Sequence, residues 1–197
     1  GQTPVAAPGL KVNCFRAGLK HPRWIEVLPN GDVLVAEALM EHLPVRNVFE
    51  FAMYATMERA AAVGRSPNRI TRLRDANGDG AAEIAETFLD RLRQPFGMAL
   101  VGETLYVGNT DGLVAFPYSH AQAKVTGAGR PMVSFKPGGH WTRSLLATPD
   151  GKRLFVGVGS LSNIGDQGME AEEGRACIYE VDLETGASRI FAGGLRN

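Results

Sequence analysis

Residues 138–163, GGHWTRSLLATPDGKRLFVGVGSLSN, contain two short apolar runs separated by a turn. The runs are Ser144 to Ala147 and Leu154 to Val158, and Pro149-Asp150-Gly151-Lys152 lies between them. Proline, aspartate and glycine favour the backbone angles of tight turns, and short apolar runs bounded by such residues are typical of buried strands. The stretch therefore predicts a β-hairpin, with His140 just ahead of its first strand.

The same hairpin unit occurs twice earlier in the chain. Each copy has a turn-prone segment, an apolar run, a short turn and a second run: Gly18–Pro22 with Trp24–Leu28 and Val33–Ala36, then Arg91–Pro95 with Phe96–Val101 and Leu105–Val107. A further copy begins at Gly193-Gly194-Leu195-Arg196-Asn197. One supersecondary unit at quasi-regular spacing indicates a stacked or radial β architecture.

Outer strands are expected between these hairpins, at Asn68–Arg74, Glu83–Phe88, Gly112–Pro117, Arg175–Val181 and Ser188–Ala192. Four short strands every roughly 45 to 55 residues is the spacing of a β-propeller blade. We interpret residues 1–197 as one all-β domain, a partial propeller of about three to four blades, because complete propellers usually have four to eight. We expect the chain to be part of a longer or cleaved protein. A smaller β-sandwich is the alternative.

An insertion at residues 39–67 lengthens the first unit and is predicted to be helical. Asn47 is placed to cap a helix with Glu50 three residues later, and Gly64 to end it. One face of this helix is apolar, at Phe49, Met53, Met57 and Ala61. We expect this stripe to pack against the sheet rather than to form a lid or a partner site.

The composition limits the partners of the chain. The 21 Lys and Arg balance the 21 Asp and Glu, so no basic face for nucleic acid is expected. The apolar runs are shorter than the ~18 residues of a membrane helix, which predicts no membrane span. Cys14 and Cys177 lack the spacing of metal ligands. We expect two buried free thiols, with a disulfide between them left open.

His140 is the first candidate for chemistry. It precedes an inner strand, where propellers bind ligands around the central channel, and imidazole is the natural general base at neutral pH. A structural histidine is the competing interpretation, and Trp141 beside it fits either a core or a stacking wall. The residues alone leave both readings open.

The loop Asp75-Ala76-Asn77-Gly78-Asp79-Gly80, with Glu86, matches the spacing of an EF-hand calcium loop. Its flanks read as strands, however, and Asn-Gly and Asp-Gly are also common hairpin turns. We favour a plain turn here and predict no metal ligand within the chain.

Two other groups of polar residues are candidates for a site. Arg196 and Asn197 could bind an acidic ligand, because a guanidinium pairs well with carboxylates. Glu172-Glu173 is interpreted as part of a solvated loop rather than a catalytic acid pair. The sequence contains no GxSxG, HExxH, Walker or Rossmann motif.

Several segments, in order, resemble the glucose/sorbosone dehydrogenases, and most closely the L-sorbosone branch: GLKHPRWIEVLPNGDVLVAE, RQPFGM, GHWTRSLLATPDGK and GLRN. The resemblance covers Pro8 to Asn197 apart from the insertion. It implies a six-bladed propeller that holds pyrroloquinoline quinone (PQQ) over its channel and oxidises a sugar or sugar-derived aldehyde. It also implies Ca²⁺, with its main ligands beyond residue 197, an external electron acceptor, and a periplasmic or secreted location.

The resemblance assigns roles to four residues. His140 matches the histidine that takes the substrate hydroxyl proton, Gln94 lies where a glutamine contacts the cofactor, and Arg196 and Asn197 match a pair that meets cofactor oxygens. The aspartate that orients the histidine in the soluble glucose enzymes is replaced here by Ser160, Ser162 and Asn163, with Asp166 later. The alternatives are a non-catalytic propeller that binds a carbohydrate or protein and, less favoured, a lactone hydrolase.

Overall fold

A computed structural model describes residues 4–41, 45, 47–120, 122–162, 165 and 167–195. Its elements are β1 (Pro22–Val27), β2 (Val33–Glu37), α1 (Val48–Arg59), β3 (Arg69–Arg74), β4 (Ile84–Leu89), β5 (Met98–Val101), β6 (Thr104–Asn109), β7 (Gly112–Pro117), β8 (Arg130–Ser134), β9 (Arg143–Ala147), β10 (Arg153–Val158), η1 (Met169–Glu172), β11 (Cys177–Asp182) and β12 (Ser188–Ala192). The described chain is therefore almost entirely β.

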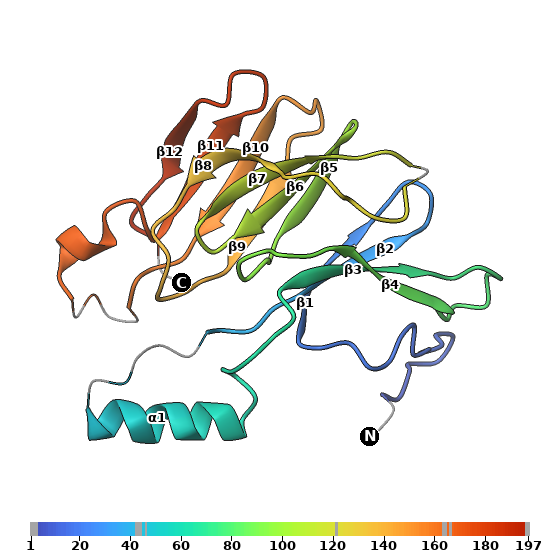
Figure 1. The fold of residues 1–197 in the computed structure, drawn as a ribbon, viewed down its shortest axis with the longest axis horizontal. Helices are drawn as coiled ribbons and strands as arrows, with labels where there is room; N and C mark the ends of the chain where they lie inside the picture. The colour runs from blue at the N-terminus through green and yellow to red at the C-terminus, as the bar shows by residue number, and fades with distance from the viewer. Residues whose placement is uncertain are drawn as a thin grey trace.

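The strands form three four-stranded antiparallel sheets, ordered β1-β2-β3-β4, β5-β6-β7-β8 and β12-β11-β10-β9 (Figure 1). Strand β5 contacts both β1 and β9, so these three are the inner strands. Each outer pair carries a register shift, at Ile70/Thr71, Leu113/Val114 and Ile178/Tyr179. Three repeated sheets with adjacent inner strands are blades of a β-propeller, and the predicted fold class is confirmed.

The hairpin turns form as the sequence predicts. The Oδ1 atom of Asn30 accepts the Asp32 N–H at 3.1 Å in the first blade. In the third blade, Oδ1 of Asp150 accepts the Lys152 N–H at 3.1 Å, and the Gly151 N–H donates to Thr148 O at 2.9 Å. These short side-chain bonds replace ladder bonds where the chain reverses.

Two apolar cores join the sheets because alternate residues of a strand point to opposite faces. On β6, Leu105 and Val107 belong to the core shared with the first sheet, whereas Tyr106 belongs to the core shared with the third. The main side chains of the first core are Leu34, Ile70, Phe88, Met98 and Phe116. Those of the second are Leu113, Leu145, Leu154, Val156 and Val181.

The two outermost faces of the three-sheet array differ. Phe15 and Leu19, from the segment before β1, pack over the free face of the first sheet. The free face of the third sheet exposes Leu146 (68%) and Phe191 (54%). The third sheet thus presents apolar side chains to solvent.

Strand β8 was not predicted from the sequence, which gave only one outer strand for the second blade. It contains Pro131 and follows the glycines Gly127 and Gly129, and these residues weaken a strand pattern. Proline is tolerated because β8 is the edge of its sheet.

The insertion contains α1, whose N-cap is as predicted: Oδ1 of Asn47 accepts the Glu50 N–H at 2.8 Å. The helix ends at Arg59, before Gly64. The predicted packing of its apolar stripe is wrong, because Phe49 is 78% exposed and the buried residue of the helix is Tyr54. Figure 1 shows α1 standing apart from the sheets.

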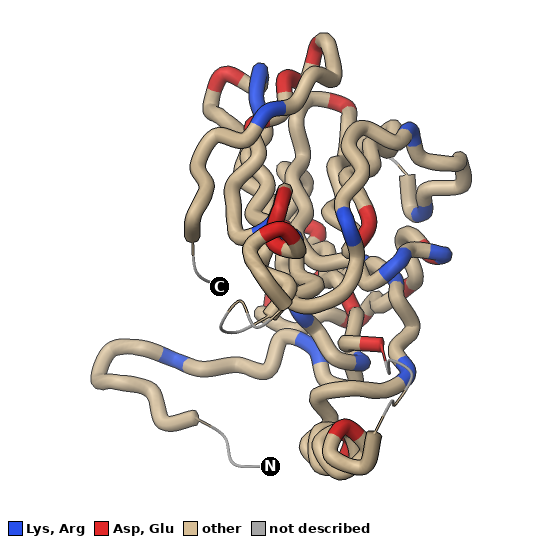
Figure 2. The backbone as a smooth tube through the Cα atoms, turned by 90° about the vertical axis from the view of Figure 1, so that its left-hand side faces the viewer, with Lys and Arg blue, Asp and Glu red and all other residues tan. Residues whose placement is uncertain are grey.

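Charged residues of both signs are interspersed along the backbone in Figure 2. Among the described residues, no helix is long and apolar enough to cross a membrane. The expectation of two buried thiols is half wrong: Cys14 is exposed, Cys177 is buried, and both are free.

Candidate functional site

The segment before each inner strand places a residue in the left-handed backbone region. These residues are His21 (φ 55°), Gln94 (φ 47°) and Gly139 (φ 56°). Side chains other than glycine rarely adopt this conformation, so its recurrence is a structural signature of the repeat. His140 follows the third of these positions and lies ahead of the inner strand β9, which begins at Arg143, as the sequence predicted.

Gly139 also permits a close approach of two loops. A Cβ atom at this position would overlap the backbone of Leu161, whose Cα would lie 2.7 Å away. The loop 136–140 therefore lies directly against the loop that follows β10. This contact brings His140 to Ser160.

The half-buried ring of His140 is held by Ser160. Its Nδ1 lies 3.0 Å from the backbone oxygen of Ser160 and 3.0 Å from its hydroxyl. The backbone N–H of His140 donates to the same carbonyl at 3.0 Å. A carbonyl can only accept, so this geometry favours a proton on Nδ1 and a lone pair on Nε2.

Two buried arginines lie beneath this loop. Arg143 has no exposed surface and Arg175 is 4% exposed. Arg143 donates to the carbonyls of His140 and Thr142 at 2.9 Å, and Arg175 donates to those of Lys136 at 2.7 Å and Gly138 at 2.6 Å. Within the described residues neither guanidinium hydrogen-bonds a carboxylate. Both donate to backbone carbonyls, and the Arg143 guanidinium also lies over the Phe135 ring, 5.8 Å from its centroid.

Burial lowers the pKa of both guanidiniums. The pKa of Arg143 falls to about 10, from desolvation first and then from the neighbouring charge of Arg175. Desolvation also lowers the pKa of Arg175, while the nearby carboxylate of Glu172 acts in the opposite direction. Both side chains remain cationic at neutral pH and add positive potential under the His140 loop.

A pocket of about 220 Å³ adjoins this loop. Its walls come from all three units: Met40 and Glu41 after β2, Arg93 and Gln94 before β5, and Pro137, Gly138, Gly139 and Trp141 before β9. Aromatic rings continue from it along the inner rim, with Trp141 6.0 Å from Phe96 and Phe96 5.5 Å from Trp24. The pocket joins a flat aromatic wall to polar donors.

Gln94 lines this pocket but is largely committed to the fold. It is 5% exposed, and its Nε2 donates to the carbonyl of Leu39 at 3.2 Å. The other predicted cofactor contacts, Arg196 and Asn197, lie outside the described residues, as do Asn163 and Asp166. Of the four predicted site residues, Gln94 therefore lines the pocket, and His140 does not line it but lies in sequence between two lining residues, Gly139 and Trp141.

The sequence predicts that Glu172 belongs to a solvated loop, but in the structure its carboxylate binds backbone N–H groups. Its carboxylate accepts the N–H of Leu161 at 2.7 Å and that of Ser162 at 3.1 Å. It thus holds the loop that carries Ser160. No local sequence pattern predicts these bonds, because they depend on η1 folding back toward the loop after β10.

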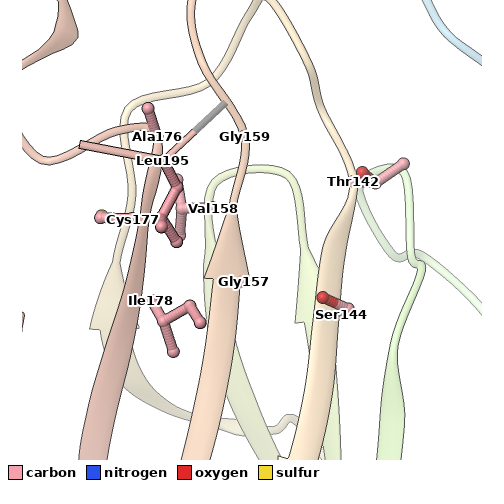
Figure 3. Close-up of a pocket in the computed structure, with 9 residues that line it drawn as sticks. All are labelled: Thr142, Ser144, Gly157, Val158, Gly159, Ala176, Cys177, Ile178 and Leu195. Carbon is pink, nitrogen blue, oxygen red and sulfur yellow. The ribbon is translucent and has the colours of Figure 1, made fainter. Parts of the chain in front are cut away.

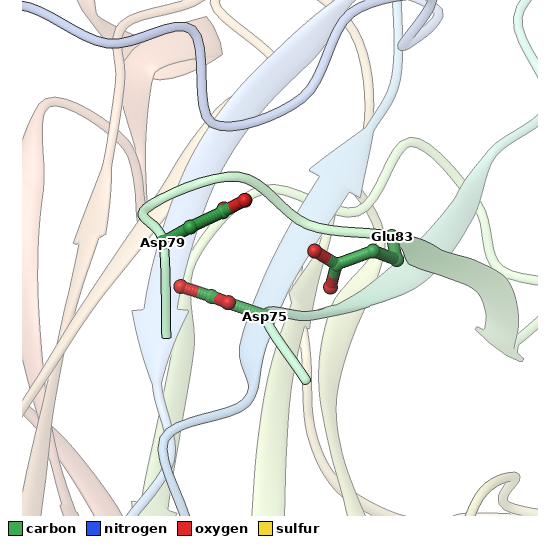
Figure 4. A group of neighbouring side chains, drawn as sticks. All are labelled: Asp75, Asp79 and Glu83. Carbon is green, nitrogen blue, oxygen red and sulfur yellow. The ribbon is translucent and has the colours of Figure 1, made fainter. Parts of the chain in front are cut away.

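In the loop between β3 and β4, the acidic side chains that lie together differ from the calcium-loop pattern in the sequence. Asp75, Asp79 and Glu83 bring ligand oxygens within 4.8 Å of one another (Figure 4). Glu86 instead forms an ion pair with Arg72. The Asp75 carboxylate accepts the N–H groups of Gly78 at 2.7 Å and Gly80 at 2.8 Å, as in a hydrogen-bonded turn.

A second pocket, of about 170 Å³, opens on the third sheet (Figure 3). Ser144 on β9, Gly157 on β10 and Ile178 on β11 form its floor and sides. Burial raises the pKa of the neighbouring Cys177 thiol, against the opposing effect of Arg143 and Arg175. The thiol is therefore protonated at neutral pH and unsuited to nucleophilic chemistry.

The architecture defines the class of protein: blades of a propeller with a polar rim at the start of the inner strands. A family model described as TrAA12-like matches residues 63–195, which is more than half of the chain. The chain belongs to the TrAA12-like family. A comparison with curated proteins gave no match.

Three solved structures share the fold. The holo PQQ domain of pyranose dehydrogenase from Coprinopsis cinerea has a TM-score of 0.66 at 21% identity, over 93% of this chain and 41% of that one. An iodide structure of a Trichoderma reesei carbohydrate-active enzyme of family AA12 gives 0.69 at 22%, over 98% and 45%. PQQ-bound aldose sugar dehydrogenase from Streptomyces coelicolor gives 0.56 at 15%, over 88% and 48%. The chain spans less than half of each.

Proposed function

We propose that this chain forms part of a PQQ-dependent oxidoreductase that oxidises a sugar or a sugar-derived aldehyde, of the aldose or L-sorbosone type. The observation that carries the proposal is His140, whose Nδ1 lies 3.0 Å from Ser160 O and whose two chain neighbours, Gly139 and Trp141, line a pocket. The family match and the names of the PQQ-containing structures support it.

The residues present fit one wall of a PQQ site. PQQ is a flat, multiply anionic quinone. Trp141 offers an aromatic surface. Arg93 also lines the pocket, although its guanidinium pairs with Asp111 at 3.3 Å, and among the described residues Glu41 is the one acidic member of the lining. Arg143 and Arg175 add buried positive charge nearby. A volume of about 220 Å³ is below the ~300 Å³ at which ligand pockets usually begin, so further walls are needed from outside the described residues.

The role proposed for His140 follows from its tautomer. Oxidising a sugar hydroxyl removes a proton from oxygen and a hydride from carbon. The Nε2 lone pair of His140 accepts the proton, and the charge that develops on the ring is stabilised by the bond from Nδ1 to the Ser160 carbonyl. The quinone, when bound, supplies the hydride acceptor.

The remaining assignments are also proposals. We infer cofactor contacts from Gln94, Arg196 and Asn197, and a Ca²⁺ ion whose main ligands lie beyond residue 197. A calcium structure of the Trichoderma reesei protein supports a role for this ion. We further propose an external electron acceptor and a periplasmic or secreted location, both on the family resemblance.

The test is a cofactor titration followed by turnover. With PQQ and Ca²⁺, the whole protein should show a saturable change in quinone absorbance and should reduce an artificial acceptor with a sugar or aldehyde. His140→Gln should lower kcat by about 10²- to 10⁴-fold, the usual contribution of a general base, while cofactor still binds.

His120→Gln is the matched control, because His120 is exposed and its ring forms a T-shaped contact with Tyr118, away from the residues of the candidate site. It should leave kcat unchanged. Absence of any saturable absorbance change would favour the non-catalytic binding module instead. Bound cofactor without turnover over a broad panel of sugars and aldehydes would contradict the proposed reaction.

A further inference from the structure

The orienting partner of His140 is a peptide group rather than a carboxylate. We propose that Arg175 and Glu172 are positioning residues that fix the Ser160–Leu161 peptide, and that this peptide sets the tautomer of His140. The inference rests on the proposed role of His140 as the base, but its structural part is measurable without turnover.

The carbonyl end of this peptide is the meeting point of three donors. Ser160 O accepts the His140 backbone N–H at 3.0 Å, the His140 Nδ1 at 3.0 Å and Nη2 of Arg175 at 3.2 Å. Arg175 therefore holds the very atom that receives the imidazole proton. A shift of this carbonyl would release the ring.

The N–H end of the same peptide is held by the opposite charge. The Leu161 N–H donates to Oε2 of Glu172 at 2.7 Å, and the next N–H, of Ser162, donates to Oε1 at 3.1 Å. In a planar trans peptide the C=O and N–H point in opposite directions. A cation and an anion thus clamp one peptide plane from its two sides, and bonds to charged groups are among the stronger hydrogen bonds.

Arg175 also fastens the loop that carries His140. Its Nη1 donates to Lys136 O at 2.7 Å and its Nη2 to Gly138 O at 2.6 Å. The planar guanidinium fixes these carbonyls and Ser160 O in one frame. The histidine loop and its acceptor therefore move together, as a supported catalytic group requires.

A contribution to stability does not explain why the Arg175 guanidinium is buried. Burying a cation without a counter-ion in contact is unfavourable, and apolar replacements of buried charges are often neutral or stabilising. Among the described residues, Arg175 hydrogen-bonds only carbonyls, and its Nε has no partner. The Arg175 guanidinium has several N–H donors in a fixed geometry, so it can position the loop.

The chemical consequence is a choice between two tautomers. If Nδ1 donates to the Ser160 carbonyl, Nε2 has a lone pair and can accept a substrate proton. If the Ser160 hydroxyl donates to Nδ1 instead, Nε2 carries the proton and cannot act as the base. The clamp favours the first state because the carbonyl is fixed in place.

The test uses the whole protein labelled with ¹⁵N-histidine, with the His140 signals assigned by comparison with His140→Gln. The proposal predicts a protonated Nδ1 and an unprotonated Nε2 at neutral pH. Arg175→Met should give a mixture of tautomers and lower kcat by about 10- to 100-fold, as loss of an orienting contact does, with little change in KM. Arg175→Lys should recover part of the loss.

Arg189→Met is the matched control, since Arg189 lies on the same sheet, is 65% exposed and pairs with Glu180. It should change neither the tautomer nor kcat. Ser160→Ala, which keeps the carbonyl, should leave Nδ1 protonated, and this variant together with Glu172→Ala decides the matter if Arg175→Met does not fold.

Three results would overturn the proposal: a proton on Nε2 in the unmodified protein, a tautomer change in Ser160→Ala, or an unchanged tautomer in both Arg175→Met and Glu172→Ala. Absence of cofactor binding or turnover would count against the proposed function only. The tautomer measured by NMR does not depend on cofactor binding or turnover.

Discussion

The first and third blades both bury charge, but in opposite ways. In the first blade each buried charge has a partner of opposite sign: Asp32 accepts from the buried Arg72 at 3.0 Å and from Arg74 at 2.6 Å, and Glu37 accepts from Arg69 at 2.7 Å. The third blade has one such carboxylate, Glu180, which pairs with Arg153 and Arg189. Only there, among the described residues, are two arginines, Arg143 and Arg175, buried with hydrogen bonds to backbone carbonyls.

The difference separates charges that hold the fold from charges that hold the site. Asp32 lies in a hairpin turn and ties it to β3, while Glu37 ties β2 to β3, so both join strands of one sheet. Arg143, the first residue of β9, and Arg175, just before β11, instead hold the irregular loop before β9. Buried pairs resist disruption, whereas unpaired buried cations are tolerated where they position other groups.

The largest effect on stability is expected from breaking a pair in the first blade. Asp32→Ala leaves the buried Arg72 without one of its two carboxylates and should lower the free energy of unfolding by about 3 kcal/mol or more. Asp150, at the corresponding turn of the third blade, is exposed, and Asp150→Ala should move the urea midpoint only slightly. Equal shifts in the two urea midpoints would show that the buried carboxylate of the first blade is no more important for stability than the exposed one of the third.

Acid should destabilise the first blade more than the third. The hydrogen bond from Arg74 lowers the pKa of Asp32. Burial acts to raise the pKa of Glu37, but bonds from Arg69, Thr71 and the Lys20 N–H outweigh it and lower the pKa. The folded state therefore binds fewer protons than the unfolded state at acid pH, and this stabilisation, complete above pH ~4.5, is lost as the pH falls further.

Hydrogen exchange checks this expectation. Between pH ~4.5 and pH ~2, amide protection should fall earlier in β2 and β3 than in β10 and β11, after correction for the intrinsic pH dependence of exchange. A simultaneous loss in both blades would show that the carboxylate pairs do not set the acid stability of the first blade.

A glycine pair gives a smaller and more local test. Gly138 (φ 94°) has open space at its Cβ position, whereas a Cβ on Gly139 (φ 56°) would overlap the Leu161 backbone. Both alanine variants carry backbone strain of about 1 kcal/mol or more. Only Gly139→Ala should also displace the histidine loop and lower kcat. Equal losses of kcat in the two variants would mean that the loop contact has no role.

The smallest effect is expected on the free face of the third blade. Arg189 is 65% exposed and pairs with the buried Glu180, which keeps Arg153 as a second partner, so the loss of the exposed arginine should cost up to about 1 kcal/mol. Arg189→Met should therefore change the urea midpoint less than Asp32→Ala does. A larger loss would mean that exposed pairs, rather than buried ones, stabilise these sheets.

The sequence predicted the parts of the fold that depend on local pattern. Turn residues and apolar runs located the inner hairpins, and Asn47 located the helix start, because these signals act over a few residues. The exposed stripe of α1 was not predictable, since the side of a helix that is buried depends on where the insertion lies. Strand β8 was hidden by Pro131.

For the site, the sequence located His140 but not its support. Ser160 was noted only as standing where an aspartate was expected, and Arg143 and Arg175 carried no signal, because arginine in a strand pattern usually indicates an exposed position. Their role depends on loops 136–140 and 160–162 meeting in space. Such contacts depend on tertiary packing and have no local signature.

The most direct test of the division between fold and site is kcat per folded molecule, measured for Asp32→Ala and Arg175→Met below the unfolding transitions of both. We predict that Asp32→Ala retains kcat despite its lower stability, and that Arg175→Met loses about 10- to 100-fold in kcat while remaining the more stable of the two. A normal kcat in folded Arg175→Met, or an equal loss in both variants, would contradict the account.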